Sequence, residues 1–242
     1  MKIFKNLMLI GRPACGKSEF IDFMKKMDLE ERRENYHIGN IYELDDFVWL
    51  WEKFEDDDIW EAMGKSRLYS KRSGHAYVVT SSEVLELMIY KFNLAISKRL
   101  RAEPSFYNDS TIFIEFSRGA SVDGGYKRAL SLFSKEVLSN TSILYIDVSY
   151  EESVRRNIAR YQEKLKHSIL AHKVPDEDME RFSKVVDWGE LTGGAQSGLL
   201  RIGGVEVPYV TMWNEPELPP GPEIAKRYKT ALDKLMSLSE AR

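Results

Sequence analysis

The sequence predicts an α/β fold with a three-layer, doubly wound and mainly parallel sheet, and two observations lead to this prediction. Short apolar runs alternate with segments of helical periodicity along the chain. The first apolar run is followed by a glycine-containing turn that opens a helix. Near-continuous apolar character is typical of strands that are covered on both faces. We expect these strands at residues 5–10, 38–44, 111–116, 142–148 and 207–212.

Helical patterns fill the segments between the expected strands. Capping boxes at Thr80-Ser81-Ser82-Glu83 and Ser149-Tyr150-Glu151-Glu152 mark two helix starts, because a hydroxyl and a carboxylate at this spacing satisfy free backbone N–H groups. The first of these helices should run to about residue 100, and the second carries an apolar stripe from Val154 to Leu165. Further helices are expected at 19–26, 126–138 and 224–238.

Composition limits the class of protein. The chain has 242 residues, of which 43% are hydrophobic, and we expect one domain over 1–242. Its formal net charge is -3 and charges of both signs are interspersed, which gives no sign of non-specific nucleic-acid binding. No stretch approaches the ~20 apolar residues that span a bilayer. With one cysteine and no targeting pattern, we expect a cytoplasmic protein without membrane partners. The oligomeric state stays open, and a dimer is compatible with the sequence.

Two segments are long for simple connections between strands. The first, about 47–110, is mostly helical in pattern, and the second covers about 166–206. We interpret the first as a substrate-covering insertion and the second as a lid, both on the same core. Within the second segment, Gly203-Gly204 has the composition of a hairpin turn.

The turn after the first expected strand carries a phosphate-binding motif. Its residues, Gly11-Arg12-Pro13-Ala14-Cys15-Gly16-Lys17-Ser18, fit the pattern G-x-x-x-x-G-K-[ST] of a P-loop. The glycines let the backbone turn its N–H groups toward a polyphosphate. Lys17 offers an ammonium to the β- and γ-phosphates, and Ser18 offers a hydroxyl to Mg²⁺. The positive end of the helix that begins here favours an anion.

Two acidic residues, Asp45 and Asp46, follow the second expected strand. Phosphoryl transfer requires a carboxylate that orients or deprotonates the acceptor hydroxyl, and either residue could supply it. Aspartate is also a favoured N-cap residue, so a capping role is equally compatible with the pattern. Since neighbouring residues of a strand face opposite sides, the sequence leaves open which of the two faces a site.

Four further residues are candidates for binding or catalysis. Glu115 ends the third expected strand, and we interpret it as a ligand of the Mg²⁺ water shell rather than as an ordinary strand end. Arg118 follows it and could bind a substrate phosphate or hydroxyl, or form a surface ion pair. Arg156 and Arg160 lie four residues apart on one helix. They could clamp phosphate or form an exposed basic stripe that pairs with nearby glutamates.

These residues resemble the nucleoside and nucleotide kinase branch of the P-loop proteins. The resemblance covers the core and rests on the motif at 11–18, on Asp45-Asp46-Phe47, on Ile114-Glu115, and on the strand at 143–148 with the arginine-bearing helix after it. In proteins similar to uridine kinase and nicotinamide riboside kinase, an Asp-x-Phe supplies the acceptor-side carboxylate, and Asp45 matches its first position. A Glu ends a later strand there, as Glu115 does here, and arginines lie on the lid helix.

The resemblance also implies the wider organisation. It implies the sheet order 2-3-1-4-5 and the cofactors ATP and Mg²⁺. The chain departs from the pattern at Phe116-Ser117-Arg118-Gly119, where a Gly often follows the Glu.

We therefore expect an ATP-dependent phosphotransferase whose acceptor is a small molecule, a nucleoside or nucleotide-like compound. The alternatives are a kinase for a sugar, a cofactor precursor or an antibiotic, and a regulatory NTPase that uses the loop as a switch. The sequence contains no Asn-Lys-x-Asp motif for guanine recognition.

Overall fold

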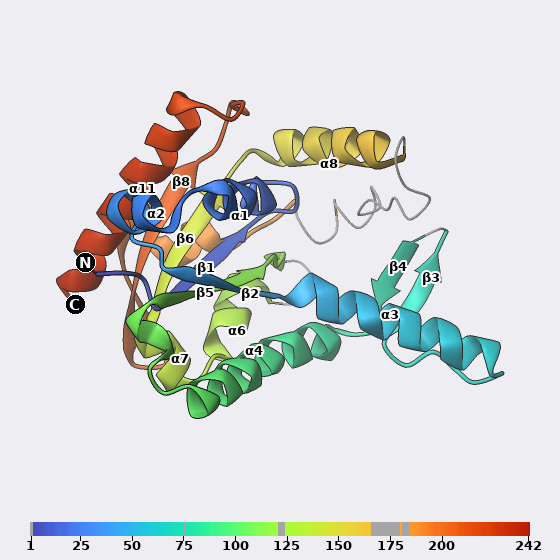
Figure 1. The fold of residues 1–242 in the computed structure, drawn as a ribbon. Coiled ribbons are helices and arrows are strands. Elements are labelled where there is room, and N and C mark those ends of the chain that lie inside the picture. The colour runs from blue at the N-terminus through green and yellow to red at the C-terminus, as the bar shows by residue number, and fades with distance from the viewer. Residues whose placement is uncertain (1, 75, 121–123, 166–179, 181–183) are drawn as a thin grey trace.

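The fold is α/β, with a six-stranded, mostly parallel sheet flanked by helices (Figure 1). The computed structural model describes residues 2–74, 76–120, 124–165, 180 and 184–242. The strand order in the sheet is β2-β5-β1-β6-β8-β7. Its strands are β1 (Asn6–Gly11), β2 (Asn40–Asp45), β5 (Ser110–Phe116), β6 (Thr141–Asp147), β7 (Ser197–Ile202) and β8 (Val205–Trp213).

Alternate residues of the central strands face two separate cores. In β1, Leu7 and Leu9 pack on the face that α1, α2 and α11 cover, whereas Met8 and Ile10 pack on the face that α4, α6 and α7 cover. All four side chains are fully buried, as expected for a strand with helices on both sides. These helices are α1 (Lys17–Lys26), α2 (Leu29–Tyr36), α4 (Ser82–Ala102), α6 (Gly125–Ser131), α7 (Lys135–Ser139) and α11 (Pro222–Glu240).

The remaining elements lie at the ends of the strands or connect them. Helix α8 carries the two arginines singled out in the sequence and lies above and to the right of α1 in Figure 1. In the second long segment, residues 166–179 and 181–183 of the expected lid lie outside the described residues. The elements concerned are α3 (Asp46–Ala62), β3 (Ser70–Ser73), β4 (Ala76–Val79), η1 (Phe106–Asn108), α8 (Tyr150–Leu165) and α10 (Trp188–Thr192).

The structure corrects three local predictions. The helix expected at 126–138 is divided into α6 and α7, because the Ser134 hydroxyl accepts a hydrogen bond from Val137 N and begins a new helix. Helix α4 has Ser81 as its N-cap, one residue later than expected. Strand β7 was not predicted: of its six residues only Leu200 is buried, so this antiparallel edge strand has no apolar run. The expected turn at Gly203-Gly204 joins it to β8.

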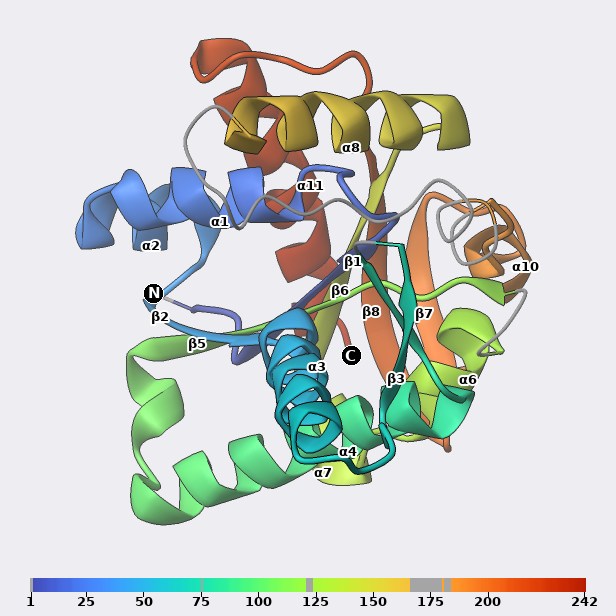
Figure 2. The ribbon, with the colours of Figure 1, turned by 90° about the vertical axis from the view of Figure 1, so that its right-hand side faces the viewer.

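The segment between β2 and β5 has two parts: α3 and the β3–β4 hairpin form an arm, and α4 packs against the sheet. Helix α3 projects from the end of β2, and the β3–β4 hairpin lies beside it (Figure 2). The completely buried Asp57 side chain ties the two together, because it accepts hydrogen bonds from the backbone N–H groups of Leu68, Tyr69 and Ser70 at 2.6–2.9 Å, and from the Ser70 hydroxyl. Burial acts to raise the pKa of Asp57, but these donors outweigh it and lower the pKa.

No helix among the described residues is long and apolar enough to cross a membrane.

We predict that Asp57→Asn loosens the arm. The amide cannot accept all the bonds that the carboxylate accepts, and leaving buried donors unpaired costs about 1–3 kcal/mol. Urea unfolding should report this loss, and amide exchange should accelerate at Leu68 and Ser70.

The effect should depend on pH, because the folded state lowers the pKa of Asp57. The extra free energy of unfolding of wild type over the variant should be full near neutral pH and should disappear as the pH falls below the ordinary aspartate range. The control is Asp56→Asn, because the Asp56 carboxylate pairs with Lys53 near the surface of the same helix. Equal stability of Asp57→Asn and wild type would contradict the role of Asp57.

Candidate active site

Residues 11–18, here called the glycine loop, join β1 to α1 in a conformation that requires small residues. Gly11 and Gly16 have φ values of 151° and 109°, and Ala14 is left-handed at 55°. A Cβ atom on Gly11 would lie 2.2 Å from the carbonyl oxygen of Ile146, and one on Gly16 would lie 2.4 Å from Asn214 Nδ2. Both glycines are therefore fixed by close approach of neighbouring chain as well as by backbone angles.

The first half of the glycine loop is tied to the surrounding elements. The Tyr126 hydroxyl on α6 accepts from Gly11 N–H at 3.0 Å and donates to Gly11 C=O at 2.9 Å. Ser153 on α8 donates to Pro13 C=O at 2.6 Å. The Arg12 guanidinium, which the sequence assigns to nucleotide binding, donates to the Val148 carbonyl at 2.9 Å. These contacts tie the first half of the loop to α6, to α8 and to the end of β6.

The second half of the glycine loop presents free donors. Within the described part of the chain, the backbone N–H groups of Gly16, Lys17 and Ser18 donate no hydrogen bond. Gly16 is the N-cap of α1, and the first N–H groups of a helix have no intrahelical partner. They also lie at the positive end of the helix dipole. This end of α1 is thus suited to an anion with several oxygen atoms.

The Lys17 ammonium lies inside the loop. It donates to the Ser117 hydroxyl at 2.8 Å and to the Arg12 carbonyl at 3.2 Å, and the side chain is buried. These neutral acceptors leave its positive charge uncompensated by a direct ion pair among the described residues, and the charge faces the same space as the free N–H groups.

A cavity of about 340 Å³ opens beside the loop, at the carboxyl ends of β1, β2 and β5. Ligands of α/β sheets bind at this edge. The cavity brings together most of the residues that the sequence singles out: Pro13, Ala14, Lys17, Ser18, Asp45, Asp46, Glu115, Arg118 and Arg160.

Two of these carboxylates sit side by side. Asp45 and Glu115 are register partners in the parallel pair of β2 and β5. Burial raises the pKa of Asp45 to about 6, and the neighbouring Asp46 acts in the same direction. Burial raises the pKa of Glu115 to about 7, with Asp45 adding to the effect and Lys17 opposing it. The pair is therefore an anionic position that a bound cation would stabilise.

The other aspartate has a partner. Asp46 forms a buried ion pair with Arg118 at 2.7 Å, and Arg118 also donates to the carbonyl groups of Ser117 and Leu85. The pair is not the surface ion pair that the sequence allowed, because both side chains are buried. Asp45 caps α3, as its carboxylate accepts from Phe47 N at 2.8 Å, and it lines the cavity at the same time. The two interpretations of Asp45 are thus compatible.

The two arginines of α8 lie at different depths. Arg160 is partly exposed, lines the cavity and forms no hydrogen bond or ion pair with any described residue. Arg156 is 4% exposed and faces the back of the glycine loop. Its guanidinium donates to Glu152 at 2.7 Å, to Asn214 C=O at 2.7 Å and to Cys15 C=O at 3.4 Å. Sharing a helix face did not bring Arg156 into the main cavity.

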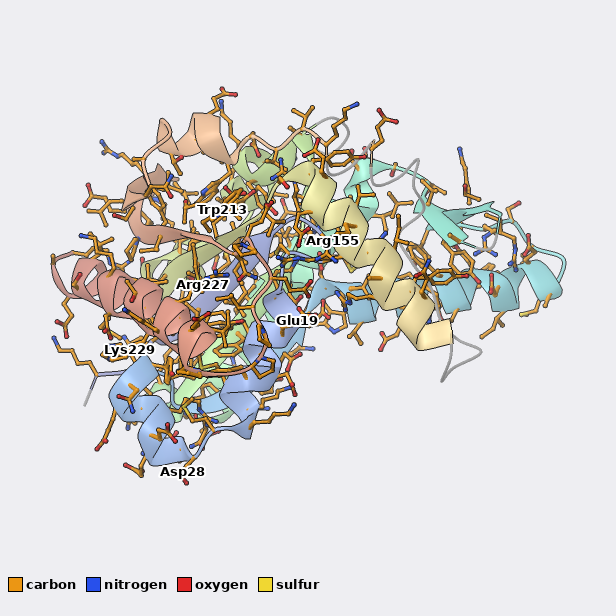
Figure 3. All side chains as sticks on the ribbon, turned by 90° about the horizontal axis from the view of Figure 1, so that it is seen from above. Glu19, Asp28, Arg155, Trp213, Arg227 and Lys229 are labelled. Carbon is orange, nitrogen blue, oxygen red and sulfur yellow. The ribbon has the colours of Figure 1, made fainter. Side chains whose placement is uncertain are left out.

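A second cavity of about 140 Å³ lies on the other side of Gly16, between α8, α11 and the chain that follows β8. Figure 3 shows this region from above, with Glu19 on α1, Arg155 on α8 and Arg227 on α11 around it. Arg160 lines both cavities. The other residues that line the second cavity include Arg156, Asn214, Leu218, Ile224 and Tyr228.

Sequence reasoning missed several residues of the site. Ser117 contacts Lys17, and Asn157 lines the main cavity. Each is a neighbour in sequence of an arginine that was singled out instead, Arg118 and Arg156. Asn214 and Tyr126 hold the loop from distant parts of the chain, and no local spacing signals such contacts.

The residues present fit a magnesium ion that is bound together with phosphate oxygens. The described residues contain no group of three or more His, Cys, Asp or Glu side chains placed to hold a metal alone. The cavity does contain the Ser18 hydroxyl and the Glu115 carboxylate. Mg²⁺ is commonly held by one or two protein oxygens plus substrate phosphates.

The comparisons with known proteins give little information on this chain. No protein-family model matches it, and no curated protein matches it. Among solved structures, it is similar to one described as the crystal structure of APE1195, with 15% sequence identity and a TM-score of 0.41, over 100% of this chain and 97% of that chain.

We predict that Glu115→Gln stabilises the protein when metal and nucleotide are removed with EDTA and dialysis. Because the folded state raises the pKa of Glu115 to about 7, ionising it weakens the fold, and this penalty is absent below the unfolded pKa and complete above about 7. At pH 8 the variant should be more stable by about 1–3 kcal/mol in urea unfolding, and at pH 5 the gain should be small. An equal gain at both pH values would mean that the charge of Glu115 is not its source.

Proposed function

We propose that this chain is a Mg²⁺- and ATP-dependent phosphotransferase whose acceptor is a hydroxyl group of a small molecule. One observation carries the proposal: a single cavity joins the ammonium of Lys17 and the free N–H groups at the start of α1 to the carboxylate of Asp45 on a neighbouring strand. Phosphoryl transfer depends on a held triphosphate and on an acceptor placed in line with it, and this arrangement has a group for each task.

The glycine loop would hold the triphosphate. Gly16, Lys17 and Ser18 offer backbone N–H groups, and Lys17 adds a charge that its present neutral partners do not compensate. The backbone at Gly16 has no side chain between it and an approaching phosphate. Ser18 and Glu115 would hold Mg²⁺, which supplies positive charge to the phosphate oxygens.

Asp45 would act on the acceptor. As the acceptor hydroxyl forms its bond to the γ-phosphorus, the bond from that phosphorus to the oxygen of ADP breaks, and the hydroxyl proton passes to the Asp45 carboxylate. Asp46 is less suited to this task because Arg118 occupies it. The Asp46–Arg118 pair instead fixes the start of α3, and with it the position of Asp45.

The surroundings of Asp45 support a nucleoside or nucleotide-like acceptor. Phe47, Leu50 and Leu85 line the cavity beside the carboxylate, which gives a ring an apolar wall next to a polar reacting end. The second cavity, behind Gly16, would take the base of ATP, and Arg160 would bridge the two spaces. The five parallel strands, numbered along the chain, stand in the order 2-3-1-4-5, which supports the kinase-like interpretation. A cytoplasmic location would supply the ATP that the proposed reaction needs.

The direct test is a screen of acceptors for ADP formation above the acceptor-free rate. We expect turnover with one class among nucleosides, nucleoside monophosphates, sugars, cofactor precursors and aminoglycosides, with a phosphorylated product detected by mass spectrometry. ATP hydrolysis that no acceptor stimulates would favour a regulatory NTPase instead.

We predict that Lys17→Ala abolishes most nucleotide binding. Removing the ammonium leaves the phosphate charge without its buried counter-ion, and the loss should be at least about tenfold in affinity, since bonds to charged groups contribute about 1.5–3 kcal/mol. Calorimetric titration with Mg-ATP measures it. Lys25→Ala is the matched control, because Lys25 is on the same helix and pairs with Glu43 at the surface. If Lys17→Ala binds Mg-ATP as wild type does, the loop does not hold the phosphates.

We predict that Asp45→Asn separates binding from catalysis. ATP affinity should stay near wild type, and acceptor-dependent turnover should fall by at least roughly a hundredfold, the lower end of general-base contributions. Asp46→Asn should act differently: it leaves Arg118 buried without its counter-charge, so the free energy of unfolding should fall by about 3–5 kcal/mol. Normal turnover by Asp45→Asn with the true acceptor would remove Asp45 from the mechanism.

A further inference from the structure

We propose that Arg156 and Asn214 are positioning residues that orient the phosphate-binding N–H of Gly16 by holding the carbonyl of Cys15 from behind. The inference rests on the proposed function, because it assigns a role at the same phosphate site. It gives Arg156 a task other than contact with the transferred phosphoryl group.

The Cys15 carbonyl is a point where two distant segments meet. It accepts from Asn214 Nδ2 at 2.9 Å and from Arg156 Nη1 at 3.4 Å. Arg156 also donates to the backbone carbonyl of Asn214 at 2.7 Å, so the three residues form a closed triangle. Arg156 is 4% exposed and Asn214 is 5% exposed. The contacts are therefore shielded from competing water.

The geometry of the peptide unit carries the effect to the other side. In a trans peptide, the C=O of one residue and the N–H of the next point in opposite directions in one plane. Holding the Cys15 oxygen toward Arg156 and Asn214 therefore turns the Gly16 N–H away from these two residues. This N–H has no partner among the described residues and is the first donor of the α1 terminus.

The amide of Asn214 has its orientation fixed by a second contact. Arg227 on α11 donates to Asn214 Oδ1 at 2.8 Å, so the NH₂ group must be the end that faces Cys15. The same NH₂ group lies where a Cβ atom on Gly16 would fall, at 2.4 Å. The glycine at position 16 thus permits the bracing contact as well as the backbone turn.

The charge of Arg156 is already compensated. Glu152, one turn earlier on α8, accepts from Arg156 Nε at 2.7 Å. Hydrogen bonds from Arg155, followed by those from Arg156, lower the pKa of Glu152 to about 2, so this partner stays ionised over the working pH range. A guanidinium that is paired in this way acts on the glycine loop through its hydrogen bonds. Arg160, one turn later, has no such partner among the described residues.

The test measures binding of inorganic triphosphate with Mg²⁺ by calorimetry, because this probe fills the phosphate site without a base. Asn214→Ala and Arg156→Met should each raise its Kd by about tenfold, the effect of misplacing one donor to a charged group. The double variant should lose little more than either single variant, because both residues act on one carbonyl. Arg155→Met is the matched control: it breaks ion pairs of α8 with Glu152 and Glu217 but does not touch the glycine loop, and it should bind as wild type does.

Circular dichroism and urea unfolding accompany each titration. If Arg156→Met does not fold, Arg156→Lys supplies the same measurement, because it keeps a charge beside Glu152 but has no planar fork for two carbonyls. Folded variants that bind triphosphate within about twofold of wild type, or losses that add fully in the double variant, would overturn the positioning role. Failure of wild type itself to bind triphosphate would refute the proposed function, and this role with it.

Discussion

The outward anchoring of the glycine loop is the constraint on which the rest of the site depends. Tyr126 holds Gly11, Ser153 holds Pro13, and Asn214 with Arg156 holds Cys15. The anchors come from α6, from α8 and from the chain that follows β8, so the loop reaches its conformation only when these distant segments are assembled around it. Held in this way, the loop leaves the free N–H groups at the start of α1 and the Lys17 ammonium available to a ligand, and the site is organised before any ligand binds.

The ionised carboxylates of Asp45 and Glu115 in the cavity lower the stability of the fold. Asp45 and Glu115 are adjacent on paired strands, and burial raises the pKa of both. Both carboxyl groups are held in this position although burial disfavours their ionised forms. Burial also raises the pKa of Asp46, but there the Arg118 guanidinium opposes the effect, and the ion pair ties the start of α3 to the end of β5. In the proposed function, Glu115 binds the cation and Asp45 acts on the acceptor. The Asp46–Arg118 ion pair instead holds α3 and β5 together.

Some of this arrangement could be predicted from the sequence, and the reason differs from residue to residue. The spacing of Gly11, Gly16, Lys17 and Ser18 is local, so the loop and the helix after it were predictable. The sequence also places Asp45 and Glu115 at the ends of two expected strands, and strand ends in a parallel sheet share the edge where ligands bind. The choice between Asp45 and Asp46 depends on where β2 ends and α3 begins, and a one-residue shift reverses it.

Other features depend on contacts that no spacing encodes. Arg156 and Arg160 share a helix face, but only the packing of α8 against the glycine loop decides that one is buried behind it and the other borders the cavity. Asn214 lies about two hundred positions from Cys15, and its role follows from tertiary structure alone. Strand β7 was not predicted for another reason: an edge strand with one buried residue has no apolar pattern that the sequence could reveal.

The most direct test of the account is an amide NMR titration of the labelled protein with Mg-ATP. The N–H signals of Gly16, Lys17 and Ser18 should move downfield together and saturate at one Kd, because these groups change from having no protein partner to donating to phosphate oxygens. The Leu68 and Ser70 signals, in the distant arm, should stay in place. Saturable shifts that leave Gly16, Lys17 and Ser18 unchanged, or the absence of any saturable shift, would contradict the account.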